Sequence, residues 1–184
     1  LARYDCIVLP TTPCLSDSVI EKLRQYVAAG GNLISCFDGA LFDDAGNKRR
    51  DFGLADVIGA RFLEESWTFH NVDYFSIEDS ASNFFDDIQN QLIPTPGHAL
   101  KVEASSATVL ARFHQPMSGP YVELSPKTTP AILFNHYGKG RSLYLAASFG
   151  EFYARYAAPE HKRIVANAIA AFSRPGLTVG NAPE

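Results

Sequence analysis

Residues 4–37 read YDCIVLPTTPCLSDSVIEKLRQYVAAGGNLISCF, and the prediction of the fold class starts from this stretch. Residues 6–9 form a short apolar run, which is typical of a strand covered on both faces. Apolar residues then recur at helical spacing over 19–27, and Gly30-Gly31 ends that helix. A second buried strand follows over 32–37. Two such strands joined by a helix form a right-handed β-α-β unit, which predicts an α/β protein with parallel strands.

The composition is that of an ordinary globular domain. The chain has 184 residues, of which 46% are hydrophobic and 20% charged, enough for one domain with a sizeable core. Its formal net charge of −4 argues against a nucleic-acid partner. No apolar run approaches the roughly 20 residues that cross a bilayer, so we expect no membrane partner. Three cysteines without a CxxC pair weakly favour a reducing, cytoplasmic compartment.

The second half of the chain favours antiparallel strands. Residues 99–103 and 108–113 alternate apolar with polar side chains. Tyr137-Gly-Lys-Gly140 between two apolar runs predicts a hairpin, with glycines where a positive φ is needed. Residues 115–130 contain four prolines, and we expect them to form a long irregular loop.

A last amphipathic helix is predicted over 161–172, and Pro175-Gly176 follows it. We therefore expect one domain over 1–173 and a tail or linker over 174–184. The first residue is Leu1, and a strand follows almost at once, as in a piece of a longer polypeptide.

Several stretches together carry a resemblance to a known family. They are YDCIVLP with LRQYVAAGGNLIS, then DFGLADVIGARF, then PAILFNHYGKGRSLYLAASFGEFY followed by PEHKRIVANAI. They resemble the glutamine-amidotransferase-like domain that serves as the trimerisation domain of certain bacterial β-galactosidases and follows the barrel of related glycoside hydrolases. The resemblance covers roughly residues 3–173.

The resemblance implies a flavodoxin-like layered sheet, mostly parallel with an antiparallel hairpin in the second half, that lacks its first β-α element. It also implies that the domain performs no catalysis itself and needs no cofactor. Its partners would be the rest of its own polypeptide, a glycosidase-type barrel, and further copies in a homo-oligomer. Its role would be assembly or support of the neighbouring carbohydrate-active barrel.

Cys36 is the candidate nucleophile. Active amidotransferase-like relatives place this cysteine on a G-x-C-x-G turn, with a His-x-Glu after a later strand. In this sequence Ile34 and Asp38 stand in place of the glycines. Phe149 or Ser148 stands where the histidine is needed. These departures predict that the catalytic turn is lost.

A thiol without a base, with an unperturbed pKa of about 8.5, stays largely protonated near pH 7. We therefore predict no catalytic residue and a buried, structural Cys36. The alternative is a Cys-dependent hydrolase or amidotransferase-like enzyme that uses Cys36, with His136 as the base and Glu151 or Asp38 as the orienting group.

Trp67, Phe69, Tyr74 and Phe75 form an aromatic-rich segment. Aromatic side chains bring large apolar area at little entropic cost, so the segment is a candidate interface with another subunit or domain. Packing in the core is the competing interpretation. A third function follows from the same residues, a sugar-binding module in which Trp67 stacks on carbohydrate.

The candidate metal ligands are His70 with Asp73 and the aspartates of the loop over 38–51. Two side chains three positions apart in a strand point to opposite faces, which argues against the first pair. The loop matches no EF-hand spacing and is explained as a solvated acidic surface. We therefore predict no metal site.

Overall fold

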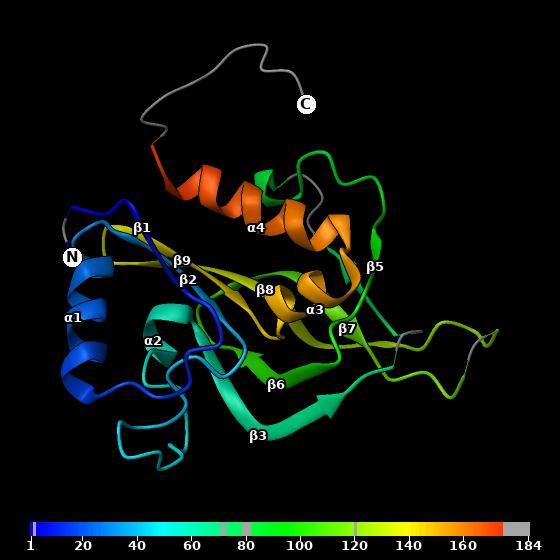
Figure 1. The fold of residues 1–184 in the computed structure, drawn as a ribbon, viewed down its shortest axis with the longest axis horizontal. Helices are drawn as coiled ribbons and strands as arrows, with labels where there is room; N and C mark the ends of the chain where they lie inside the picture. Colours follow the sequence, from blue (N-terminus) through cyan, green and yellow to red (C-terminus); the bar gives the residue numbers. More distant parts are fainter. Residues whose placement is uncertain (2, 71–72, 79–81, 120, 175–184) are drawn as a thin grey trace.

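The computed structural model describes residues 1, 3–70, 73–78, 82–119 and 121–174 (Figure 1). The strands are β1 (Cys6–Leu9), β2 (Asn32–Cys36), β3 (Ala60–Thr68), β4 (Tyr74–Ile77), β5 (Leu92–Pro94), β6 (His98–Ala104), β7 (Thr108–His114), β8 (Lys127–Tyr137) and β9 (Gly140–Leu145). The helices are α1 (Asp17–Ala28), α2 (Ala55–Ile58), α3 (Phe149–Tyr156) and α4 (Pro159–Phe172), with a 3₁₀ turn η1 (Asn83–Phe85).

The predicted β-α-β unit is confirmed. Strands β1 and β2 pair in parallel, and α1 connects them. The Ser16 hydroxyl caps α1 by accepting a hydrogen bond from the backbone N–H of Val19 at 3.4 Å. The helix buries one apolar face, which includes Ile20, Leu23 and Val27.

The expected flavodoxin-like, glutamine-amidotransferase-like sheet is wrong. Seven strands form one mixed sheet in the order β1-β2-β9-β8-β7-β4-β5, while β3 and β6 pair separately. Of the six described strand pairs in the large sheet, β1–β2 and β2–β9 are parallel and the other four are antiparallel. The sheet is therefore not mostly parallel, and it curls into a half-barrel.

The connections explain the difference. A parallel pair needs a long crossover, whereas direct connections between neighbouring strands impose antiparallel pairing. β7, β8 and β9 follow one another without an intervening helix. Between β2 and β3 the one helix is α2, which has four residues. The opening β-α-β unit is thus not repeated in the large sheet.

The predicted hairpin joins β8 to β9 and is confirmed. Tyr137 pairs with Gly140 across the turn, and Gly138 has a φ of 59°. A Cβ atom at Gly138 would lie 2.7 Å from the backbone of Ala28, so the turn also needs glycine for lack of space. The predicted irregular loop is shorter than expected, because β8 already begins at Lys127 and takes in Pro130 where its register with β7 shifts.

Helices cover both faces of the large sheet (Figure 1). Ser142 points toward α2, where its hydroxyl donates to the Val57 carbonyl at 2.7 Å. Phe134 points the other way, with its ring centroid 6.5 Å from that of Phe172 on α4. None of the helices in the described part of the chain is long and apolar enough to cross a membrane. Residues 175–184 of the predicted tail lie outside the described residues, so the domain boundary at 173 stays a prediction.

Candidate functional site

The corner after β2 is where the alternative enzyme would need its nucleophile. Cys36 is 8% exposed, and burial raises the pKa of its thiol to about 12. The next residue, Phe37, has a φ of 51°, and its N–H donates to the Leu145 carbonyl at 2.7 Å. The Tyr144 hydroxyl donates to the Phe37 carbonyl at 2.7 Å. The thiol is therefore protonated and covered, which is the opposite of what a nucleophilic cysteine requires.

Asp38 lies beside this corner and does not activate the thiol. Its Oδ1 atom is buried and has no hydrogen-bond partner among the described residues. Burial raises the pKa of the Asp38 carboxyl. An ionised carboxylate here would oppose a second negative charge on Cys36, because like charges disfavour each other's ionised form.

The structure does not bring Cys36 together with His136. On β9, Leu145 pairs with Cys36 while Arg141 pairs with His136. Four strand positions correspond to about 13 Å, so the imidazole lies at the other end of β9 from the thiol. Glu151 is on α3, where its exposed carboxylate pairs with Arg155 at 3.4 Å. The three residues of the alternative enzyme thus do not form a catalytic group.

The aromatic segment divides into core and partly exposed residues. Phe69 and Phe75 are 5% and 0% exposed and pack inside this chain. Trp67 and Tyr74 are half-buried. The Trp67 ring lies edge-on to Phe69 at 5.2 Å, and the Lys101 ammonium stands 5.0 Å from its centroid. Of the four predicted interface residues, Trp67 and Tyr74 remain available in part to a partner.

The Asp73 carboxylate accepts hydrogen bonds from two backbone N–H groups. Its Oδ2 atom accepts a hydrogen bond from the His70 N–H and its Oδ1 atom accepts one from the Met117 N–H, each at 2.6 Å. In the part of the chain that the structure describes, no three His, Cys, Asp or Glu side chains converge as metal ligands. The Asp43 carboxylate of the acidic loop likewise accepts hydrogen bonds from Asn47 and from the Ala45 N–H.

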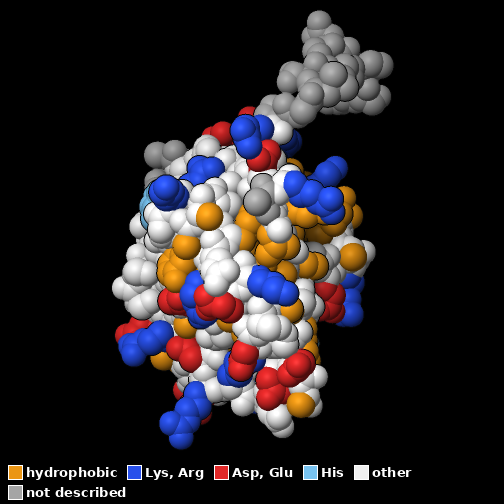
Figure 2. Space-filling view, turned by 90° about the vertical axis from the view of Figure 1, so that its left-hand side faces the viewer, with side chains coloured by type: hydrophobic (Ala, Val, Ile, Leu, Met, Phe, Trp, Pro, Cys, Tyr) orange, Lys and Arg blue, Asp and Glu red, His pale blue; other side chains and the backbone are white. Residues whose placement is uncertain are grey.

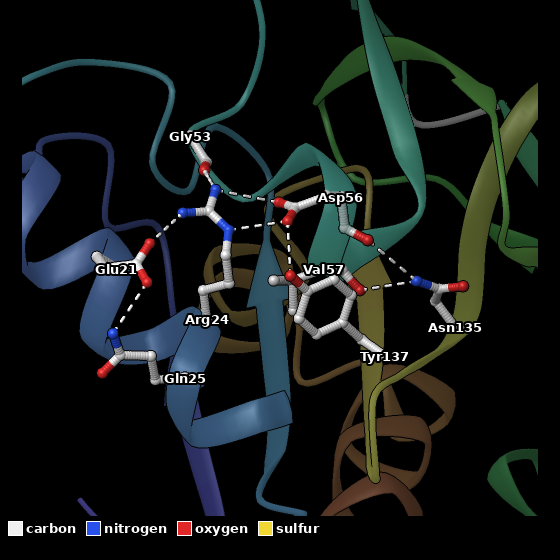
Figure 3. A network of polar contacts seen from close by, with 8 residues as sticks. All are labelled: Glu21, Arg24, Gln25, Gly53, Asp56, Val57, Asn135 and Tyr137. Carbon is white, nitrogen blue, oxygen red and sulfur yellow. Dashed lines mark hydrogen bonds and ion pairs between the residues drawn. The ribbon is translucent and has the colours of Figure 1, made fainter. Parts of the chain in front are cut away.

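A polar network joins α1 to α2 and β8 (Figure 3). The Arg24 guanidinium donates to both Asp56 carboxylate oxygens, at 2.8 and 3.2 Å, and to Glu21 at 2.8 Å. The Tyr137 hydroxyl also donates to Asp56, at 2.9 Å. Partial burial raises the pKa of Asp56, but the hydrogen bonds from Arg24 and Tyr137 outweigh it and the pKa is lowered. The Asn135 amide donates to the Val57 carbonyl at 2.9 Å, so this network holds elements together and leaves no reactive group free.

The surface beside β1 carries a hollow of about 740 Å³. Its lining includes Tyr4, Tyr26, Arg141 and Phe172. The Arg141 guanidinium lies 5.0 Å from the Phe172 ring centroid and donates to the Asn32 side chain at 3.0 Å. Figure 2 views this side of the molecule, where hydrophobic side chains gather in one area among interspersed charges. The hollow thus combines aromatic walls with a guanidinium group that is already partnered.

Sequence reasoning missed the apolar residues between β7 and β8. Tyr121 is fully exposed at 104%, and Val122 and Leu124 are each 44% exposed. The prolines of this segment correctly indicated a loop. Side-chain exposure, however, depends on how the loop leaves the sheet, and no local pattern encodes that.

The comparison with family models identifies one family. The model of the β-galactosidase trimerisation domain matches residues 1–161. Beta-galactosidase BbgII of Bifidobacterium bifidum is 28% identical over 159 residues, which cover 80% of this chain and 20% of that protein. The chain thus spans about a fifth of the length of this curated relative.

Solved structures of related fold belong to more than one kind of enzyme. The β-galactosidase of Bacillus circulans sp. alkalophilus superposes with a TM-score of 0.70 at 18% identity, over 93% of this chain and 23% of that one. The α-L-fucosidase isoenzyme 2 of Paenibacillus thiaminolyticus gives 0.67 at 18% identity, over 93% and 25%. At these identities the likeness concerns the fold alone. The family match, which covers most of the sequence, goes further: the chain belongs to the β-galactosidase trimerisation domain family.

Proposed function

We propose that this chain is a non-catalytic assembly domain of a larger β-galactosidase-type polypeptide and holds copies of that polypeptide together as a trimer. The observation that carries the proposal is the trimerisation-domain match over residues 1–161. The curated relative is a β-galactosidase about five times longer than the matched region, in line with a domain attached to a catalytic unit.

The geometry of the candidate site supports this function over the alternative enzyme. A Cys-dependent hydrolase needs an exposed thiolate beside a base. Cys36 is buried with a pKa raised to about 12, and His136 pairs at the opposite end of β9. The sugar-binding alternative is less favoured, because Lys101 already lies over the Trp67 ring that would stack on carbohydrate.

The proposal extends to the partners of the domain. Trp67 and Tyr74 are half-buried aromatic side chains that a neighbouring domain or subunit could cover. The substrate of the attached catalytic unit would be a β-galactoside, and carbohydrate would bind there and not on this domain.

The test is to remove the domain from the full-length protein. Sedimentation equilibrium should give a trimer for the intact protein and a smaller species for the truncated one. Hydrolysis of a β-galactoside by each species, measured per active site, reports separately on support of the barrel. A truncated protein that remains trimeric with unchanged hydrolysis would overturn the proposal.

A further inference from the structure

Between β7 and β8, residues 115–119 and 121–126 extend away from the body of the molecule (Figure 1). We refer to them as the β7–β8 arm. Near its tip, Tyr121 is fully exposed and Val122 and Leu124 are each 44% exposed. Exposed apolar side chains that cluster on one projection are unusual in a monomer and mark a contact site.

The base of the arm is held by buried polar groups. His114 is 4% exposed, and its ring nitrogens contact the Ser76 hydroxyl and the Ser125 carbonyl. Asp73 is 1% exposed and accepts the Met117 N–H at 2.6 Å. These contacts fix where the arm leaves the sheet. The tip is therefore presented to solvent from a defined base.

Tyr121 at the tip has an unfavourable backbone conformation and an exposed aromatic ring. Tyr121 has a φ of 65°, a left-handed conformation that glycine or asparagine adopts at lower cost. Its ring gains no burial among the described residues, since it is fully exposed. A strained residue persists where something compensates for it, and an apolar surface that buries the ring would do so.

We propose that the tip of the arm docks onto a second copy of this chain. This inference rests on the proposed trimeric function. Closed threefold rings use heterologous contacts, in which an element of one copy meets a different surface of the next. A projecting arm fits one side of such a contact.

The chemistry of the tip specifies an apolar partner surface. Between Tyr121 and Leu124 the only charged residue is Glu123. On a second copy the candidate partner side chains are Val8 on β1, Tyr153 on α3 and Ile169 on α4, which are exposed and lie away from the arm. Aromatic side chains that enter such surfaces carry much of the energy of an interface, which assigns the main contribution to Tyr121.

The test uses the full-length protein with Tyr121→Ser and Leu124→Ser together. A matched control replaces Leu63 and Val19, which are 42% and 38% exposed on other elements, by serine. Sedimentation equilibrium should show the arm variant dissociating at a protein concentration at least tenfold higher than wild type, with the control unchanged. Equal unfolding temperatures of the dissociated proteins would show that the fold is intact.

A second measurement reports on the arm without removing its apolar residues. In a Cys14→Ser background, which removes the thiol that is exposed in the described part of this chain, Ser118→Cys places a thiol near the tip. Its alkylation should be several-fold slower in the assembled protein than after dilution below the dissociation concentration.

The outcomes separate the two proposals. A wild-type trimer that the arm variant leaves unweakened, or that the control weakens equally, overturns the arm contact and leaves the trimeric function standing. Equal alkylation rates in the assembled and the diluted protein also overturn the arm contact. If alkylation is already slow in the diluted protein, the tip contacts the rest of its own polypeptide instead. A wild-type protein that is monomeric throughout overturns both.

Discussion

The corner after β2 and the β7–β8 arm each carry a tyrosine, which is buried at the corner and exposed on the arm. At the corner, Tyr144 is 0% exposed, its ring lies 5.3 Å from that of Phe52, and its hydroxyl is bonded to the Phe37 carbonyl. On the arm, Tyr121 is fully exposed on a left-handed residue. The chain fills the place where an enzyme would keep an open reactive group, and it presents apolar area where a monomer would keep polar side chains. The contrast supports the proposed role of this chain in assembly.

Replacing each of the two tyrosines by alanine should give the largest difference in stability. Tyr144→Ala should lower the free energy of unfolding by about 3–5 kcal/mol, because it removes a buried aromatic ring. Tyr121→Ala should change the stability of the dissociated chain by less than about 0.5 kcal/mol. Urea denaturation of both variants measures the difference. Similar losses at the two positions would mean that the chain itself buries the Tyr121 ring.

The interior can also be tested through a buried titratable group. His161 lies against Phe149 and Phe152, and burial lowers the pKa of its imidazole to about 4, with Glu160 partly opposing the shift. The unfolded chain takes up this proton at about 6.5, before the folded chain does. The free energy of unfolding should therefore have its full value above about pH 6.5 and fall by roughly 3 kcal/mol as the pH drops to 4.

The control for this prediction is His161→Phe, which replaces the imidazole by a ring suited to its aromatic neighbours. Urea denaturation at several pH values should give a flatter profile for the variant over the same range. Identical profiles for the two proteins would show that His161 is not the group responsible.

A smaller effect is expected for the network that joins α2 to β8. Tyr137→Phe removes the hydroxyl that donates to Asp56 at 2.9 Å and should cost about 1 kcal/mol of stability. The same change releases part of what lowers the pKa of Asp56, so NMR titration should find that pKa higher in the variant. An unchanged Asp56 titration would exclude a direct contribution from the hydroxyl.

The smallest effect is predicted for the replacement of Cys36, which should not alter enzymatic activity. Cys36→Ala should leave β-galactoside hydrolysis by the full-length protein unchanged. In the wild-type protein iodoacetamide at pH 8 should modify the exposed Cys14 and leave Cys36 unmodified. Rapid modification of Cys36 together with loss of activity in the alanine variant would restore the enzyme hypothesis.

The sequence correctly predicted the parts of the fold that depend on local patterns of apolar residues and glycines. The β-α-β unit followed from apolar periodicity and Gly30-Gly31, and the hairpin followed from Tyr137-Gly-Lys-Gly140. The prediction of a mostly parallel sheet, which extended this one β-α-β unit to the whole domain, was wrong. Strand order is a property of the whole chain, and β9 pairs with β2 across more than a hundred residues of intervening sequence.

The candidate site was predicted less well than the fold. Ile34 and Asp38 predicted an altered turn and a buried Cys36, but the hydrogen bonds of Phe37 with Leu145 and Tyr144 follow only from the packing. Phe75 reads like an interface residue, yet it is 0% exposed because β4 lies between β7 and β5 and its side chain faces α3. The exposure of Tyr121 is tertiary information of the same kind.

Hydrogen–deuterium exchange on the full-length protein can show whether the arm, and not the corner, is covered on assembly. Amides of the arm and of the corner over 36–40 are followed above and below the concentration at which the assembly dissociates. The arm is predicted to exchange more slowly in the assembled protein, while exchange at the corner stays the same. An arm that exchanges equally in both states, or a corner that alone responds to assembly, would contradict this account.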